Sequence, residues 1–149
     1  MKTCQDVMTK EPVCCLPDDS VERAAQVMRF ENVGAVPVID SYDNYRLIGI
    51  VTDRDLALRV LGDKRDPRQT RLGDVMTVDL LTCHPTDSLR VALDIMAQHQ
   101  IRRIPVVNES GQIIGIIAQA DIATRTEDPE QTAEVVEQIS QPNPDPILH

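Results

Sequence analysis

The chain has 149 residues, enough for one ordinary domain or two small units, and its core must be aliphatic because aromatic residues make up only 2%. Acidic residues outnumber basic ones by 24 to 15, which gives a net charge of −9. A chain of this charge with so few aromatic residues is poorly suited to binding nucleic acid or an anionic membrane. No apolar stretch approaches the roughly 20 residues of a membrane helix, and the first residues lack the apolar segment of a signal peptide, so we expect a cytoplasmic protein.

Three short motifs occur twice in the chain. The first two return after 68 residues and the third after 66, so a loop absorbs a difference of two residues. The pairs are Asp-Val-Met-Thr at 6–9 and 74–77, Val-Pro-Val at 36–38 with Ile-Pro-Val at 104–106, and Ile-Gly-Ile at 48–50 and 114–116. Such a repeat predicts the organisation of the chain. We predict a first repeat at 1–62, a linker at 63–72, a second repeat at 73–126 and an acidic, proline-containing tail at 127–149.

Each repeat predicts the element order β-α-β-β-α, because β-rich runs beside prolines alternate with apolar residues at helical spacing. For the first repeat, the expected elements are a strand at Val13–Leu16, a helix at Asp18–Phe30, strands at Gly34–Ile39 and Leu47–Thr52, and a helix at Asp53–Leu61. For the second, they are a strand at Leu81–His84, a helix at Asp87–His99, strands at Ile104–Val107 and Ile113–Ala118, and a helix at Gln119–Arg125. The tail adds one candidate helix at Thr132–Ser140.

The four cysteines are expected to be reduced and mostly buried, as is usual in a cytosolic protein. Cys15 and Cys83 occupy equivalent positions in the two repeats, so we expect them in matching strand environments. No Cys-x-x-Cys or His/Cys ligand spacing occurs, and we therefore predict no zinc site. A redox role for the adjacent Cys14 and Cys15 is the alternative. The paired methionines, Met8 with Met76 and Met28 with Met96, are expected to be packing residues.

Thr52 and Asp55 are the first candidates for ligand chemistry. They lie three residues apart at the predicted start of a helix, so both can face the same side of one turn. A carboxylate accepts two hydrogen bonds from a cis-diol such as that of ribose, and a hydroxyl can bond either a ligand or the backbone. The structural alternative is that Thr52 caps the helix at Asp53–Leu61. The two roles are compatible.

The order of these motifs, given twice, resembles the cystathionine β-synthase (CBS) domain, and the two copies over residues 6–125 resemble a tandem CBS pair, or Bateman module. The resemblance implies an α+β fold in which two β-α-β-β-α repeats pack through their sheets with pseudo-twofold symmetry. In this family the clefts between repeats bind adenosine-containing ligands. The resemblance implies that Thr52 and Asp55 hold the ribose.

The resemblance also implies where the rest of a nucleotide would bind. Arg102 and Arg103 directly precede Ile-Pro-Val, where family members carry basic residues that reach the phosphates, and Arg54 could help. The alternative for two adjacent arginines is a solvated strand end. The adenine is expected near Val78 and the backbone of Ile104.

The equivalent site of the second repeat lacks most of these groups. Ala118 stands in place of Thr52, while Gly34 and Ala35 stand in place of the two arginines. Only Asp121 remains, as a weaker second site. We expect one competent nucleotide site in each chain.

We find no catalytic constellation in the sequence, and so expect a regulatory module that binds AMP, ADP or ATP without catalysis and requires no cofactor or metal. A homodimer, the four-repeat disc of the family, would form through helix faces such as Asp18–Phe30 and Asp53–Leu61. A further, unknown protein partner would read the ligand state. The alternatives are a sensor of S-adenosylmethionine or NAD, and a structural scaffold with vestigial clefts that docks through its acidic tail. A small enzyme would need a nucleophile or metal site that the sequence does not reveal.

Overall fold

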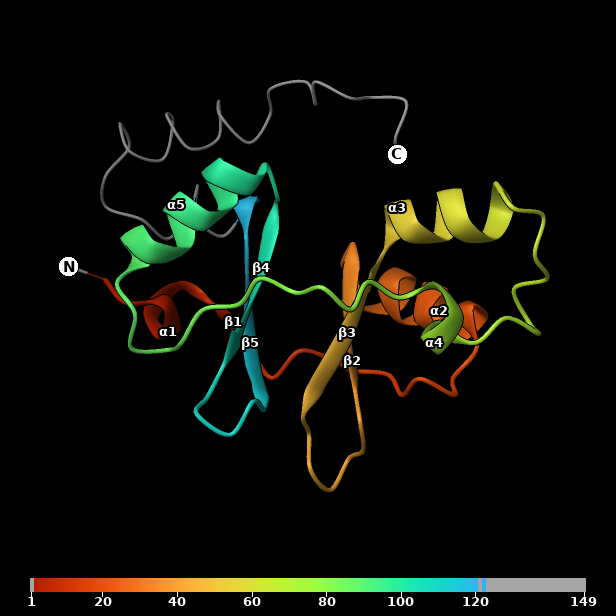
Figure 1. The fold of residues 1–149 in the computed structure, drawn as a ribbon, viewed down its shortest axis with the longest axis horizontal. Helices are drawn as coiled ribbons and strands as arrows, with labels where there is room; N and C mark the ends of the chain where they lie inside the picture. Colours follow the sequence, from red (N-terminus) through yellow and green to blue (C-terminus); the bar gives the residue numbers. More distant parts are fainter. Residues whose placement is uncertain (1, 121, 123–149) are drawn as a thin grey trace. The chain divides into compact units, whose positions relative to one another are not determined.

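The computed structural model describes residues 2–120 and 122, and the chain divides into two compact units. Unit 1 combines Met1–Glu11 with Leu81–Glu109 and the chain from Ile114 onward, and unit 2 combines Pro12–Leu80 with Ser110–Ile113. Figure 1 gives the elements of both. No helix among the described residues is long and apolar enough to cross a membrane.

Unit 2 is built on a hairpin of two antiparallel strands, β2 (Ala35–Ile39) and β3 (Leu47–Thr52). Its turn is held by Asp40, whose carboxylate accepts hydrogen bonds from the amides of Ser41 (2.7 Å) and Arg46 (2.9 Å). These bonds favour the ionised form and lower the pKa of Asp40. The helical segments of unit 2 are α2 (Val21–Glu31), α3 (Asp53–Leu56), the π-helix η1 (Ala57–Leu61) and α4 (Leu72–Val75).

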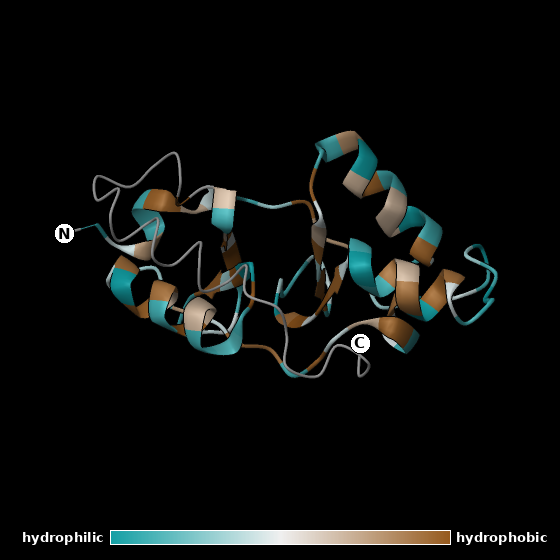
Figure 2. Cartoon of the chain, turned by 90° about the horizontal axis from the view of Figure 1, so that it is seen from above, coloured by the Kyte–Doolittle hydropathy of each residue, from teal (hydrophilic) through white to brown (hydrophobic). Residues whose placement is uncertain are grey.

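Unit 1 contains a three-stranded sheet in the order β1-β5-β4. Its strands are β1 (Thr9–Lys10), β4 (Arg103–Val107) and β5 (Ile113–Ala118), and its helices are α1 (Cys4–Val7) and α5 (Leu89–His99). Figure 2 shows that apolar residues dominate the strands, whereas the helices carry both apolar and polar residues. This pattern is that of a sheet buried under amphipathic helices.

The first segment of each repeat packs with the core of the other repeat. Met8 belongs to unit 1, where a Cβ added to Gly115 would lie 2.4 Å from its sulfur. Met76 lies in the same way over Gly49 in unit 2, at 2.5 Å. These close approaches explain why both strands carry glycine at this position. The repeats predicted from the sequence therefore do not coincide with the compact units.

The strands predicted at Val13–Leu16 and Leu81–His84 are wrong as strands. Each segment pairs through a single parallel bridge, Cys15 with Val38 and Cys83 with Val106. Cys15 pairs with β2 through two hydrogen bonds, from its amide to the Pro37 carbonyl and from the Ile39 amide to its carbonyl. Because a proline follows closely in each segment and offers no N–H, the ladder ends after one residue.

The other predicted elements agree with the structure more closely. The helix predicted at Asp18–Phe30 begins at Val21, because Ser20 is its N-cap and accepts a hydrogen bond from Arg23. The helix predicted at Asp87–His99 likewise begins at Leu89. The strand at Ile113–Ala118 is confirmed at both ends. Part of the helix predicted at Gln119–Arg125, and all of Thr132–Ser140, lie outside the described residues.

Two corrections concern helices. The helix predicted at Asp53–Leu61 is one turn of α-helix that widens into the π-helix η1, where the Gly62 amide donates to the Ala57 carbonyl at 2.8 Å. The short helices α1 and α4, which end on the Asp-Val of the repeated motif with the methionine as C-cap, were not predicted. Each has only four residues, too few to show helical periodicity.

Packing of the cysteines and methionines follows the prediction. All four cysteines are buried and free of disulfides, and Cys15 and Cys83 have the same pairing in the two units. Met8, Met28 and Met96 are buried in the two cores, and Met76 packs against that of unit 2.

Candidate functional site

Thr52 and Asp55 form a reciprocal pair at the start of α3. The Thr52 hydroxyl accepts a hydrogen bond from the Asp55 amide (3.1 Å), and Asp55 Oδ2 accepts one from the Thr52 amide (2.9 Å). This capping box satisfies two backbone donors that the end of β3 and the first turn of the helix would leave unpaired. The capping role is therefore confirmed, while the ligand role stays a prediction.

The second oxygen of Asp55 remains the more open one. Asp55 Oδ1 lies 3.9 Å from Nε of Arg59, which is longer than a hydrogen bond. The Asp55 side chain is 14% exposed, so the carboxylate is largely enclosed but still reaches solvent. The Thr52 hydroxyl, used as an acceptor by the helix, keeps its own proton for donation. The pair can thus offer one donor and one acceptor to a ligand.

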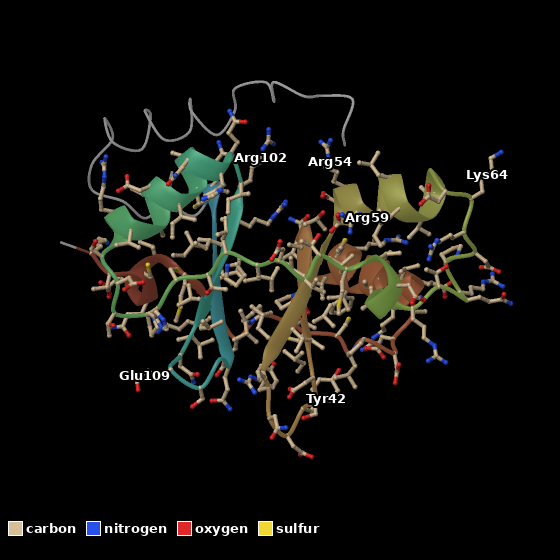
Figure 3. All side chains as sticks on the ribbon, viewed as in Figure 1. Tyr42, Arg54, Arg59, Lys64, Arg102 and Glu109 are labelled. Carbon is tan, nitrogen blue, oxygen red and sulfur yellow. The ribbon has the colours of Figure 1, made fainter. Side chains whose placement is uncertain are left out.

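Arg59 was missed by the sequence analysis. Its Nη1 donates to the carbonyl of Val75 at 2.8 Å, and its side chain is about half exposed. Figure 3 shows Arg59 on the side of the helical segment that faces α4, with Arg54 projecting away from its start. The spacing of four residues from Asp55, which places an ion pair on one helix face, was the signal that could have found it.

Val78 directly follows Thr77, which pairs with β3 from the segment after α4. Thr77 pairs antiparallel with Ile50, through hydrogen bonds of 2.9 and 3.0 Å. Because the two segments run in opposite directions, Val78 lies toward Gly49 and Val75 toward Thr52. Val78 is 67% exposed, as a ligand-contacting apolar side chain would be before binding.

Arg102, Arg103 and Ile104 belong to unit 1. Arg103 begins β4 and is half-buried, whereas Arg102 precedes it and is exposed, so the pair includes the solvated strand end considered above. The Ile104 side chain is fully buried, which leaves only its backbone for a ligand. Thr52 and Asp55, in contrast, belong to unit 2. The predicted ribose residues and the predicted phosphate residues are therefore in different units, and each group is described within its own unit.

In the second repeat, the turn equivalent to that of Thr52 and Asp55 has the same backbone hydrogen bond but different side chains. Asp53 donates its amide to the Gly34 carbonyl (2.9 Å), and in the same way Gln119 donates to Arg102 (2.9 Å). Ala118, which replaces Thr52, brings no hydroxyl to the second of these turns. Asp121 lies outside the described residues.

The cysteines do not form an activated thiol site around Cys14 and Cys15. Burial raises the pKa of Cys14, and it raises the pKa of Cys15 to about 11. Thiolate is the reactive form, so both side chains are poor nucleophiles at neutral pH. In unit 1, a hydrogen bond between the thiols of Cys4 and Cys83 lowers the pKa of Cys4 and raises that of Cys83.

A shallow hollow in unit 1 is lined by residues of the N-terminal segment. They are Gln5, Asp6, Met8, Thr9 and Lys10. None of the predicted ligand residues lines it. Among residues 2–120 and 122, no three or more His, Cys, Asp or Glu side chains are grouped so as to hold a metal ion.

The chain contains two repeats whose bridges are equivalent, and a capped turn follows β3. These features define a tandem pair of the same small domain. The CBS domain model matches residues 4–62 and 72–128, and the chain belongs to the CBS domain family. The structure has the α+β CBS fold.

Its relatives include stand-alone proteins of the same size. It is 37% identical over 143 residues to the CBS domain-containing protein YhcV of Bacillus subtilis, covering 96% of this chain and 99% of that protein. Hypoxic response protein 1 of Mycobacterium tuberculosis is 33% identical over 123 residues, 83% of this chain and 84% of that protein.

Two solved structures are also similar. Hypoxic Response Protein I, with two coordinated zinc ions, superposes with a TM-score of 0.74 and 32% identity, covering 84% of this chain and 99% of that one. CBSX2 in complex with AMP gives a TM-score of 0.69 and 28% identity, covering 95% of this chain and all of that one.

Proposed function

We propose that this chain is a regulatory module that binds an adenine nucleotide, AMP, ADP or ATP, without catalysis. The observation that carries the proposal is the Thr52–Asp55 pair, which keeps one carboxylate oxygen and one hydroxyl proton for a ligand. The AMP complex of the related CBSX2 supports the ligand class.

In this proposal the ribose binds at the start of α3. Asp55 Oδ1 accepts hydrogen bonds from the 2′- and 3′-hydroxyls, while Thr52 donates to the ribose. Because the capping box already restricts both side chains, the ligand loses less affinity to their ordering.

The other parts of the nucleotide are assigned to residues from the sequence. Arg102 and Arg103 bind the phosphates, with Arg54 as a further exposed cation, and this choice favours phosphate-bearing ligands over the positively charged S-adenosylmethionine. Val78 and the Ile104 backbone contact the adenine. One nucleotide binds per chain, because the second repeat offers only Asp121.

We further propose that the chain forms a homodimer through helical surfaces of unit 2. Phe30 is 90% exposed at the end of α2, and Leu61 is 73% exposed at the end of η1. Covering these two large apolar side chains with a second copy of the chain would remove apolar surface from water, which favours association. Light scattering of Phe30→Glu should give the mass of one chain, against two for the wild type. A wild-type protein of one chain's mass contradicts the dimer.

The test of the ligand is a thermal-shift panel of AMP, ADP, ATP, NAD and S-adenosylmethionine, with calorimetry on any ligand that raises the melting temperature. The variant is Asp55→Ala. Its matched control is Asp6→Ala, because the Asp6 carboxylate accepts from the Thr3 amide at 2.9 Å in the same type of capping box. The control loses a cap but none of the proposed ligand contacts.

We expect adenine nucleotides to stabilise the wild type and Asp6→Ala but not Asp55→Ala, with one site per chain. A shift with S-adenosylmethionine alone would contradict the phosphate assignment. No shift with any ligand would contradict the proposal and favour a scaffold role.

A further inference from the structure

Arg59 occupies a position between the proposed ribose anchor and the end of α4. On one side its Nε lies 3.9 Å from Asp55 Oδ1, and on the other its Nη1 donates to the Val75 carbonyl at 2.8 Å. Val75 is the last residue of α4, so its carbonyl lacks a partner within that helix. The guanidinium therefore bonds an acceptor that has few other partners.

This second contact decides where the guanidinium lies. A long arginine side chain on a surface samples many rotamers, and an exposed ion pair alone does little to order it. The Val75 carbonyl is the fixed point here, because Val75 is only 2% exposed and belongs to the core of unit 2. Arg59 thus brings a positive charge to a defined place beside the carboxylate.

The two oxygens of Asp55 are consequently distinguished. The Thr52 amide holds Oδ2 at 2.9 Å, and the positive charge of Arg59 lies on the side of Oδ1. A carboxylate held by one hydrogen bond alone can still turn about that oxygen. The charge beside the other oxygen opposes this rotation and keeps its lone pairs in one direction.

We infer that Arg59 is a positioning residue for the ribose: it aligns Asp55 Oδ1 to accept from both hydroxyls of the cis-diol. The inference rests on the proposed function. It makes Arg59 a determinant of selectivity for ribose over 2′-deoxyribose, since a carboxylate held in one direction gains most when both hydroxyls are present.

The test measures calorimetric dissociation constants for AMP and for 2′-deoxy-AMP. These probes carry the same phosphate and base, so the ratio of their constants reports on the 2′-hydroxyl alone. The variants are Arg59→Met, which keeps an unbranched side chain and removes the guanidinium, and Arg59→Lys, which keeps the charge but lacks the planar fork that reaches the Val75 carbonyl and Asp55 together.

The matched control is Arg90→Met. Arg90 Nε lies 3.0 Å from Asp94 Oδ1 in another four-residue arginine–aspartate pair, and both side chains are about half exposed on α5. This variant removes a comparable helical ion pair in unit 1. Melting temperatures without ligand show whether each variant is folded.

We expect the wild type to prefer AMP by about 3- to 10-fold, the worth of one hydrogen bond. In Arg59→Met the preference should fall to near one, and in Arg59→Lys to an intermediate ratio, while Arg90→Met keeps the wild-type ratio. Equal weakening of both nucleotides by Arg59→Met, with the ratio kept, would overturn the inference and leave Arg59 a merely structural link to α4.

The outcomes separate this inference from the proposed function. Loss of binding in Asp55→Ala together with an unchanged ratio in Arg59→Met would overturn the role of Arg59 alone. A wild-type protein that binds neither AMP nor 2′-deoxy-AMP would overturn the role of Arg59 in AMP selectivity, and one that also binds neither ADP nor ATP would overturn both.

Discussion

Units 1 and 2 share a backbone design but differ in their polar side chains. In both, a cysteine bridges to the first strand of the hairpin, a methionine covers a glycine, and the long helix ends in a left-handed residue, Asn32 or Gln100. The difference lies at the turn after the last strand, where unit 2 has Thr52 and unit 1 has Ala118. The cysteines and methionines that the repeats share therefore report on packing, whereas the ribose pair is only half shared, because Asp55 has a counterpart in Asp121 and Thr52 has none.

The largest expected effect tests the equivalence of the two cores. Met96→Ala should lower the free energy of unfolding by about 2–5 kcal/mol, because the side chain is fully buried and leaves a cavity. Met28→Ala should cost less, since Met28 is 9% exposed and solvent can fill part of the space. Urea unfolding measures both. Equal losses would contradict the difference in burial.

The glycines test the methionine contacts. Gly49→Ala and Gly115→Ala should each destabilise the protein by about 1–3 kcal/mol through overpacking. Adding Met76→Ala to the first, or Met8→Ala to the second, should make the double variant less destabilised than the sum of its single variants. Strict additivity would show that the methionines simply move aside.

Thr52 tests the point at which the units differ. Thr52→Ala should cost about 0.5–2 kcal/mol through loss of the cap, and Thr52→Ser should restore most of it by keeping the hydroxyl. Chemical unfolding gives the stabilities. An alanine variant as stable as the wild type would show that the cap adds no stability, which would leave ligand binding as the role of Thr52.

Much of this asymmetry was predictable from the sequence. The repeat and the capping motif placed Thr52 and Asp55 correctly because their interactions are local, three residues apart. The contact between Arg59 and α4 was missed because it joins residues 16 apart in the chain, and only the folded unit brings Val75 to the helix. The segment around Cys15 was predicted as a strand because its apolar run was given more weight than Pro17, which ends the pairing after one bridge.

Alkaline pH tests the equivalent cysteines. Burial raises the pKa of Cys15 from its ordinary value of 9.0 to about 11, so the folded state keeps a proton that the unfolded state loses. The stability that this thiol contributes is present below pH 9 and is lost as the pH rises toward 11, on the order of 1 kcal/mol by pH 10.

The measurement is the unfolding free energy between pH 8 and pH 10.5 for the wild type and Cys15→Val. The variant should fall less steeply with pH. Parallel curves for the two proteins would show that another group causes the loss.

The smallest effect concerns a difference on the helix surfaces. Arg90 and Asp94 form an ion pair on α5, and the equivalent residues on α2 are Glu22 and Gln26. Arg90→Ala should cost about 0.3–0.5 kcal/mol at low salt and almost nothing at 1 M salt. A thermal melt at both salt concentrations checks this, and a cost that is independent of salt would point to packing of the arginine stem.

The exchange of first segments between repeats also sets the order in which the chain can assemble during synthesis. Residues 1–11 leave the ribosome well before their packing partners in unit 1, which begin only at Leu81. At about 5–20 residues per second, this segment waits on the order of ten seconds, while most of unit 2 is already complete. Residues 1–11 therefore help to complete a unit whose other parts are made later, and two repeats synthesised as separate chains could complete their cores only by exchanging these segments.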